Sequence, residues 1–329
     1  MVDLNLFYHY LRVVAPSIAD SGIGTLNVWG TLVPELALKN EFLMHAILMI
    51  AASHFAQTDV STYEVAVVTH RSQAFRLLRA GMQRVTPENM DALVAASMLM
   101  SLDAMANAAP PGQMSLCSLP ASTWLHHVRG SATILMSVGD LPETSEFSKF
   151  MGKDMVEFAN VLAALPCLEC FDSRLSDLYP VDHASPYFPM LAHLDRLYND
   201  RNQPDYILRI FSFPALLDPV MVELLKTQDR TALRIVDVYY TMVREYCALN
   251  APRVWFLKGV AKVLPIDTDQ RLGGLGFIET ALPVHENIEA ILSSFDEFFL
   301  NVDEDVDDFF SGDGDTSEHH GSEVSEWFA

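Results

Sequence analysis

Apolar residues recur along this chain with the 3.6-residue period of α-helices, and stretches with the two-residue alternation of a strand are almost absent. Short connections that contain Pro or Gly separate the periodic segments. The pattern predicts an all-α fold, a single large helical domain of about ten or more helices over residues 1–300, with no internal repeat. The expected helices cover residues 3–15, 41–57, 61–84, 90–108, 122–138, 145–164, 186–199, 204–211, 219–226, 229–248, 251–263 and 284–300.

Two of the expected helices are apolar on almost every face. The first, residues 41–57, follows a short polar turn at residues 29–40, where Asn40 has the chemistry of a helix N-cap. The second, residues 90–108, follows Thr86-Pro87-Glu88-Asn89, where a proline and an acidic residue favour a helix start. A helix that is apolar all round must be surrounded by protein or by lipid. Residues 41–57 include two histidines and a serine and are too short and too polar to span a bilayer, so we expect both helices inside a protein core.

Charge adds to this picture because it is uneven. The 329 residues include 21 Lys or Arg and 43 Asp or Glu, a formal net charge of −22, and twelve of the acidic residues lie in residues 296–329 without a single Lys or Arg. Affinity for nucleic acid comes largely from Lys and Arg that neutralise phosphates. We therefore expect this chain not to bind nucleic acid directly. The N-terminus has no cationic flank and no cleavage-like site, so we also expect an intracellular protein without a membrane span.

Aromatic residues are interleaved with the acidic residues near the C-terminus. Charge repulsion and a scarcity of large apolar residues favour disorder over residues 301–329. Acidic and aromatic residues mixed in this way are typical of an activation segment that docks in an apolar groove of a partner. The alternative is a tail that only keeps the protein soluble. The predicted docking residues are Phe309, Phe310, Trp327 and Phe328.

Several short motifs could indicate chemistry, and each has a plainer interpretation. Cys167-Leu-Glu-Cys170 has the spacing of a zinc half-site, but a structural zinc needs four ligands and no second pair completes the set. Gly273-Gly274-Leu275-Gly276 has no Lys-Ser/Thr after it, so a flexible turn is favoured over a phosphate site. Asp307-Asp308-Phe309-Phe310 resembles the magnesium-binding motif of terpene synthases, but Ser311 occupies the third carboxylate position. We predict no catalytic residue, no metal and no cofactor; the alternative is an all-α enzyme or carrier that acts on an isoprenoid or terpenoid.

Histidines are the remaining candidates for chemistry. His126 and His127 are adjacent on an expected helix and point about 100° apart, so they do not share a metal ion easily. His45 and His54 are nine positions apart on another expected helix, which places them on different faces. We interpret all four as core or interface histidines.

Several short sequence motifs follow one another between residues 4 and 295. They are Leu4-Asn5-Leu6-Phe7-Tyr8-His9-Tyr10; Trp29, Pro34 and residues 42–56; Val85-Thr86, Glu88-Asn89 and Asp91-Ala92-Leu93; residues 124–130; Phe211 and Phe213-Pro214-Ala215; Glu223-Leu224-Leu225; residues 232–236; Tyr239-Tyr240; and residues 255–259. Together they resemble the regulatory domain of fungal binuclear zinc-cluster transcription factors of the sterol-uptake-control type.

The resemblance implies a helical sensor domain that binds a sterol or a related hydrophobic metabolite. Its occupancy would decide whether the factor is held back in the cytoplasm or enters the nucleus and activates genes, either of sterol and lipid metabolism or of secondary metabolism. The six closely spaced cysteines of the family's DNA-binding zinc cluster do not occur here. The chain is then either an excised domain or a short form that acts through a partner, which we expect to be a second copy or a zinc-cluster DNA-binding protein.

Methionines indicate where such a ligand would bind. Fifteen occur, several of them on the two all-apolar helices, and this unbranched, polarizable side chain lines adaptable apolar sites well. Ordinary filling of a large core is the alternative. Together with the resemblance, the methionines predict an apolar pocket for an uncharged, sterol-like molecule. The predicted lining residues are Met44, Leu48, Met98, Leu102, Trp255 and Phe256.

Overall fold

Helices make up nearly all of the structure, as the periodicity predicts. The computed structural model describes residues 2–58, 63–86, 88–109, 115–120, 128, 145–147, 168–215, 219–227, 229–251 and 253–263, all within one compact unit that spans residues 1–284. Over these ranges the only strands are β1 (Ala108–Ala109) and β2 (Leu119–Pro120), which pair in parallel. The predicted all-α class is therefore confirmed. The helices expected at residues 122–138 and 284–300, most of the helix at 145–164 and the tail at 301–329 lie outside the described residues.

Residues 2–20 form one continuous helix whose winding changes in the middle. It consists of α1 (Val2–His9), a π-helical turn η1 (Tyr10–Val14) and α2 (Ala15–Asp20). Four of its fully buried side chains follow one another at intervals of four residues. In a regular α-helix, residues four apart are about 40° out of phase, so four such positions would turn away from one face. The wider π turn takes up this drift and keeps the row against the core. The row consists of Leu6, Tyr10, Val14 and Ile18.

Residues 28–37 are also helical, so the polar turn expected at residues 29–40 is wrong over most of its length. A second π turn, η2 (Val28–Leu32), runs into α3 (Val33–Ala37), where a proline sits in the first turn and so needs no amide partner. Three of its buried side chains are again four residues apart, a spacing that the loop-like residues between them conceal in the sequence. They are Trp29, Val33 and Ala37.

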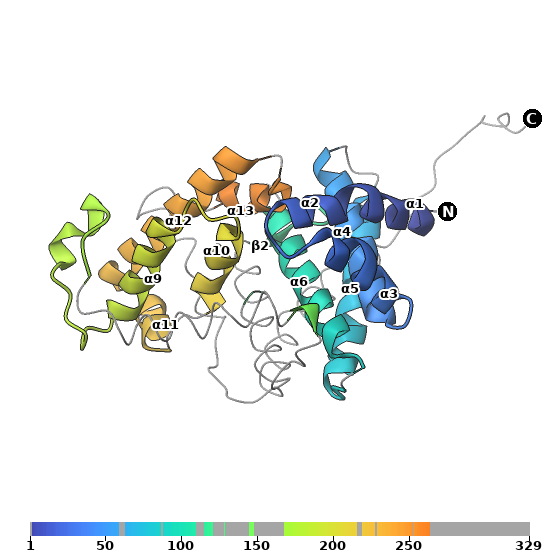
Figure 1. Cartoon of the computed structure of the whole chain (residues 1–329), viewed down its shortest axis with the longest axis horizontal. Helices are drawn as coiled ribbons and strands as arrows, with labels where there is room; N and C mark the ends of the chain where they lie inside the picture. The colour runs from blue at the N-terminus through green and yellow to red at the C-terminus, as the bar shows by residue number, and fades with distance from the viewer. Residues whose placement is uncertain are drawn as a thin grey trace, which may run out of the picture. The chain divides into compact units, whose positions relative to one another are not determined.

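Three long helices form the centre of the N-terminal part: α4 (Glu41–Thr58), α5 (Glu64–Met82) and α6 (Met90–Ala106). They pack against one another, and α1 lies along α4 (Figure 1). Apart from Asp91, every residue of α6 is buried, as its uniform apolar composition predicts. Asn40 precedes α4, but its side chain does not bond to the start of that helix. Its amide instead donates to the carbonyl of Leu36 (2.9 Å), near the end of α3. None of the helices in the described residues is both long enough and apolar enough to cross a membrane.

The C-terminal part of the described chain is built around α12 (Arg230–Asn250), which packs against its neighbours on several sides. The carboxylate of Asp229 caps it by accepting from the amide of Ala232 (2.9 Å). The ring of Phe213 stacks on that of Tyr239 at 4.2 Å between centroids, which joins α12 to α10. The other elements are the 3₁₀ turn η3 (Ser173–Leu178), α9 (Phe188–Asn199), α10 (Tyr206–Ala215) and α11 (Pro219–Lys226).

The helix expected at residues 251–263 begins four residues late, at a short 3₁₀ turn, η4 (Trp255–Leu257), which continues into α13 (Lys258–Val263). Both elements pack against α6, and α13 also packs against β1. Gly259 makes this contact possible, because a Cβ atom there would lie 2.4 Å from the carbonyl oxygen of Ala106. The last described residues of the chain thus pack against the buried helix α6.

Candidate functional site

A network of buried polar side chains joins the three central helices. Asp103 lies on α6, is 1% exposed and accepts hydrogen bonds at both carboxylate oxygens. The hydroxyl of Ser53 donates to Oδ1 (2.5 Å), and the guanidinium of Arg71 donates from Nε to Oδ2 (2.7 Å). The amide of Asn107 donates to Oδ1 (2.8 Å) and to the Ser53 hydroxyl oxygen (3.0 Å). A buried carboxylate is tolerated only with partners of this kind, so the network fixes how α4, α5 and α6 meet.

The network extends to Cys117 and contains one nitrogen atom, Nη2 of Arg71, without a hydrogen-bond partner. The thiol of Cys117 lies 3.5 Å from the side-chain oxygen of Asn107, and burial raises the pKa of that thiol. Arg71 is 7% exposed, and its Nη2 atom is buried with no hydrogen-bond partner. An unpaired buried donor costs on the order of 1–3 kcal/mol, so this atom is a ready partner for an oxygen that enters from outside the chain.

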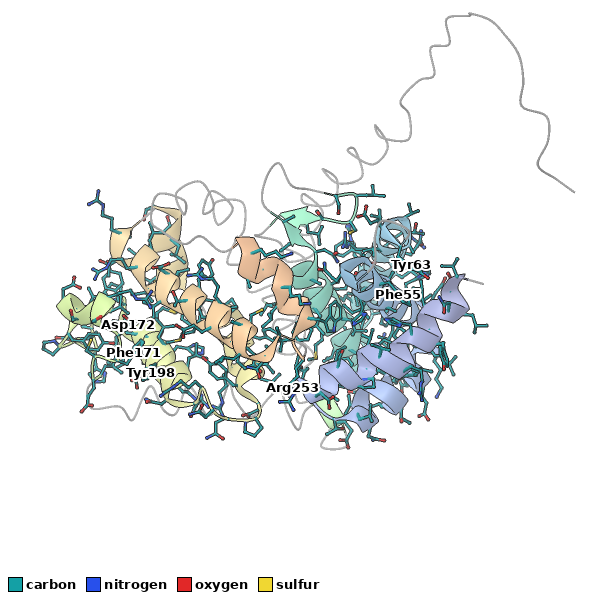
Figure 2. The ribbon with its side chains drawn as sticks, turned by 90° about the horizontal axis from the view of Figure 1, so that it is seen from above. Phe55, Tyr63, Phe171, Asp172, Tyr198 and Arg253 are labelled. Carbon is teal, nitrogen blue, oxygen red and sulfur yellow. The ribbon has the colours of Figure 1, made fainter. Side chains whose placement is uncertain are left out.

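A ladder of rings joins α1 to α4 and α5. The ring of His9 stacks on that of Phe55 (3.7 Å between centroids), and Phe55 stacks in turn on Tyr63 (4.6 Å), which precedes α5. Figure 2 labels Phe55 and Tyr63, which lie beside one another between these helices. On the other side, Nε2 of His9 lies 3.0 Å from Nδ1 of His54, a hydrogen-bond distance between two imidazoles.

The same ladder extends to η4. The ring of His54 meets that of Trp255 edge to face at 4.7 Å, and the indole N–H of Trp255 donates to the hydroxyl of Ser17 (3.0 Å) in α2. Burial lowers the pKa of His9, and burial, helped by the nearby charges of His9 and Lys258, lowers the pKa of His54 to about 4. Both rings are therefore neutral at pH 7, and one donates its N–H to the lone pair of the other.

A second pair of histidines lies between α4 and α5, with a carboxylate at each end. Nδ1 of His45 is 2.9 Å from Nδ1 of His70. Nε2 of His70 lies 3.5 Å from Asp3 in α1, and Nε2 of His45 lies 3.9 Å from Glu41. Burial lowers the pKa of His70, although Asp3 acts in the opposite direction. The interpretation of His45 and His54 as interface histidines on different faces is confirmed, since they face different helices.

These groups suit binding and helix positioning. Over the described ranges, no cluster of three or more His, Cys, Asp or Glu could hold a metal ion. Each histidine pair is instead enclosed by rings and carboxylates of neighbouring helices. Cys170 is exposed, and Cys167, the other cysteine of the Cys167-Leu-Glu-Cys170 motif, lies outside the described residues.

Comparison with known proteins identifies the family. A model of the fungal specific transcription factor domain matches residues 5–211, well over half of the chain. The chain belongs to this family.

Two relatives within the fungal specific transcription factor family match over most of this chain. Sterol uptake control protein 2 of Candida albicans is 40% identical over 293 residues, which cover 84% of this chain and 41% of the relative. Sterol uptake control protein 2 of Saccharomyces cerevisiae is 41% identical over 283 residues, which cover 84% of this chain and 31% of the relative. The resemblance to the sterol-uptake-control type is thus confirmed. The chain spans less than half the length of either relative.

The six residues predicted to line a ligand pocket lie on three elements, α4, α6 and η4. Of these, α6 contacts the other two. Met44 and Leu48 lie one turn apart on α4, Met98 and Leu102 lie one turn apart on α6, and Trp255 and Phe256 lie on η4, all of them buried except the half-buried Met44. Because α6 packs against both α4 and η4, the six residues belong to one part of the core. Their role in ligand binding stays a prediction.

The predicted docking residues of the tail, and the motifs for which the sequence favours a plainer interpretation, lie outside the described residues. They are Phe309, Phe310, Trp327, Phe328, Asp307-Asp308, Gly273–Gly276 and His126-His127.

Sequence reasoning missed the polar partners that the fold brings together. Asp103 could have indicated the network, because a carboxylate within an all-apolar helix needs a buried hydrogen-bond donor. His9 and His70 gave no such indication, since each pairs with a histidine 45 or 25 positions away.

Proposed function

We propose that this chain is the regulatory part of a fungal transcriptional regulator, which senses a sterol-like or other hydrophobic metabolite and controls genes of sterol and lipid metabolism or secondary metabolism. The observation that carries the proposal is the identity of about 40% to two sterol uptake control proteins over 84% of the chain. The proposal extends what those names say of the relatives to this protein.

The arrangement of the core supports a binding site for an uncharged ligand. Apolar sites typically carry a few well-placed polar groups that orient the ligand. The side chains of Leu48, Leu102 and Phe256 supply apolar surface from three packed elements. The unpartnered Nη2 of Arg71, which belongs to the adjoining polar network, offers a donor for a hydroxyl or carbonyl oxygen.

DNA recognition would come from elsewhere. We infer that a zinc-cluster DNA-binding protein, or a longer form of the same polypeptide, supplies it, and that the chain works in the nucleus and the cytoplasm, alone or as a homodimer. Because the net charge is −22, we expect the purified chain to give no mobility shift with duplex DNA at low salt. Salt-sensitive binding at micromolar concentration would contradict this part of the proposal.

Ligand binding can be tested by thermal unfolding. A ligand that binds only the folded state at 100 times its dissociation constant stabilises the protein by about 2.7 kcal/mol. We expect ergosterol, delivered from cyclodextrin, to raise the unfolding temperature of the wild-type chain. Phe256→Leu should reduce this rise, whereas Phe213→Leu, a matched change in the buried contact between α10 and α12, should leave it intact.

Both variants enlarge a cavity and lower the baseline stability, so the ligand-induced rise is the quantity to compare. No rise with ergosterol, other sterols or apolar polyketides would rule out the sensing function. An equal loss of the rise in both variants would place the ligand away from η4.

A further inference from the structure

The clearest feature that the proposed function does not use is the histidine pair between α4 and α5. Nδ1 of His45 lies 2.9 Å from Nδ1 of His70, and the ring centroids are 5.2 Å apart, so the rings meet end to end and not face to face. A carboxylate lies beyond each ring. Asp3 is 3.5 Å from Nε2 of His70, and Glu41 is 3.9 Å from Nε2 of His45. The four side chains form one line, Glu41–His45–His70–Asp3, that joins α1, α4 and α5.

This line has fewer protons than contacts. A neutral imidazole carries one N–H, at Nδ1 or at Nε2, and an ionised carboxylate only accepts. Two neutral rings therefore bring two N–H groups to three contacts. The carboxylates attract both protons to the Nε2 atoms beside them, which leaves two Nδ1 lone pairs directed at each other across 2.9 Å. A cation between the two Nδ1 atoms would remove this repulsion.

The surroundings of the pair are those of metal-binding histidines. A histidine that binds a metal through one nitrogen almost always donates its other N–H to a carboxylate, a carbonyl or water, which fixes the tautomer. Both rings here have a carboxylate on that side. Burial lowers the pKa of His70, although Asp3 acts in the opposite direction, so this ring is a neutral ligand at pH 7. The two carboxylates also set negative charge on both sides of an incoming cation.

We propose that His45 and His70 bind a divalent transition-metal ion such as Zn²⁺ through their Nδ1 atoms, while Asp3 and Glu41 orient the two rings. Imidazole nitrogen suits Zn²⁺, whereas Mg²⁺ and Ca²⁺ prefer oxygen ligands. Among the described residues no third His, Cys, Asp or Glu joins the pair as a ligand, so water completes the coordination. No local motif predicts the site, since its two ligands are 25 positions apart.

The distance between the two ligand atoms is compatible with one shared ion. Bonds of about 2.0–2.1 Å from zinc to two nitrogens 2.9 Å apart give an angle of about 90° at the ion. Widening the separation to about 3.3 Å gives the tetrahedral angle that zinc favours. The side chain of His45 is 22% exposed and has room to turn by this amount. The ion would then link α4 to α5 directly and α1 through Asp3.

Thermal unfolding of the full chain tests the site, with Zn²⁺ alone as the probe. An ion that binds the folded chain and not the unfolded chain raises the unfolding temperature. At about 100 times its dissociation constant, Zn²⁺ should raise this temperature by at least about 3 °C. Mg²⁺ at the same concentration should have no effect. An equal rise with Mg²⁺ would overturn the site, because it would mean that the acidic surface of a chain with a net charge of −22 attracts any divalent cation.

Two double variants locate the ion. His45→Gln/His70→Gln keeps polar side chains between α4 and α5 but removes both nitrogen ligands, so the rise with Zn²⁺ should disappear. His319→Gln/His320→Gln removes the same number of histidines from the C-terminal segment and should keep the full rise. If the first variant does not fold, His45→Gln alone should weaken binding at least about tenfold. No rise in the wild-type chain, or an equal rise in the wild type and the variant without His45, would overturn the proposal.

The orienting role of Asp3 has its own test in the same titration. Asp3→Asn keeps the size of the side chain and removes its charge, so the N–H of His70 is held less firmly at Nε2. The Zn²⁺ concentration that gives half of the full rise should increase about tenfold. Asp20→Asn removes the same charge from an exposed position at the end of α2 and should leave this concentration unchanged. Equal concentrations for Asp3→Asn and the wild type would overturn the role of Asp3 as a positioning residue.

Discussion

Asp103 shows how one buried carboxylate sets the arrangement of a helical core. Its two oxygens accept from side chains on α4 and α5 and from Asn107 beyond the end of its own helix. An apolar contact tolerates a small slip between helices, whereas hydrogen bonds of 2.5 to 2.8 Å do not. The carboxylate therefore adds a single preferred register to an interface that is otherwise held by burial alone.

Removing the charge of Asp103 should be costly. Asp103→Asn leaves the guanidinium of Arg71 buried without its counter-ion, and breaking such a pair costs about 3–5 kcal/mol. We expect a loss of this size in the free energy of unfolding from urea titration. Asp205→Asn, in a partly exposed pair with Arg209 at 3.5 Å, is the matched control and should cost less than about 1 kcal/mol. A loss below about 1 kcal/mol for Asp103→Asn would mean that the ion pair does not hold the three helices.

His193 should make the stability of the protein sensitive to acid. It is fully buried in α9, and burial lowers its pKa to about 3, with Nε2 2.9 Å from the hydroxyl of Ser212. The folded state thus prefers the neutral ring, and the resulting stability is complete above pH 6.5 and lost as the pH falls toward 3. Each pH unit in this window should remove about 1.4 kcal/mol.

Urea titrations between pH 7 and pH 4.5 measure this effect. The variant His193→Gln keeps a polar group near Ser212 but does not titrate, so the difference between wild type and variant should shrink steadily as the pH falls. All other histidines are present in both proteins, so their titration cancels in the comparison. A constant difference over this range would assign the acid sensitivity to other groups.

At the scale of elements, the sequence was most informative where burial is uniform. The helices α4 and α6 were predicted nearly to the residue, because continuous apolar composition leaves few alternatives. The turn predicted at residues 29–40 was wrong, because the buried positions Trp29, Val33 and Ala37 are four apart and separated by residues typical of loops. The six predicted lining residues fall on elements in contact, but the polar network beside them depends on pairings between positions up to 54 apart, which no local pattern contains.

The packing of α13 against α6 should be disrupted by any side chain at position 259, where the chain has glycine. A Cβ atom there would lie 2.4 Å from the carbonyl oxygen of Ala106 and 2.5 Å from that of Met105, and backbone atoms cannot move aside as a side chain does. Overpacking typically costs about 1–3 kcal/mol, so Gly259→Ala should lower the thermal unfolding temperature by several degrees. Gly30→Ala is the control, because its Cβ would meet only the side chain of Leu26, at 3.2 Å. Equal effects of the two changes would mean that η4 and α13 are not held against α6.

At the scale of the whole molecule, the negative charge is unevenly distributed along the chain. Residues 296–329 carry −12 of the net charge of −22, so the rest of the chain carries −10. Over the residues that the structure describes, most large apolar side chains are buried in the core. Any docking of partners through acidic and aromatic side chains would therefore fall to the C-terminal segment.

This segment should act as an activation segment when moved to another protein. Fused to a heterologous DNA-binding domain, residues 301–329 should activate a reporter gene, because exposed aromatics bury much area when they dock. Replacing Phe309, Phe310, Trp327 and Phe328 by alanine should abolish the activation while all ten acidic residues of the segment remain. Equal activity of the two segments, or none from the wild-type segment, would identify it as a solubilising tail.

The two π turns carry a consequence for how lengths can vary in relatives. A π turn is an α-helix with one residue inserted, so deleting a single residue between positions 10 and 14 would restore regular winding and rotate everything before it by about 100°. Leu6 would leave the core, and His9 would move off Phe55. In a homologue that has lost this residue, the helix has regular α-helical winding. Its buried apolar residues should then be spaced alternately three and four apart, and not always four apart. The constant spacing of four, present here at 6-10-14-18 and again at 29-33-37, is a mark by which the insertion can be recognised in sequences alone.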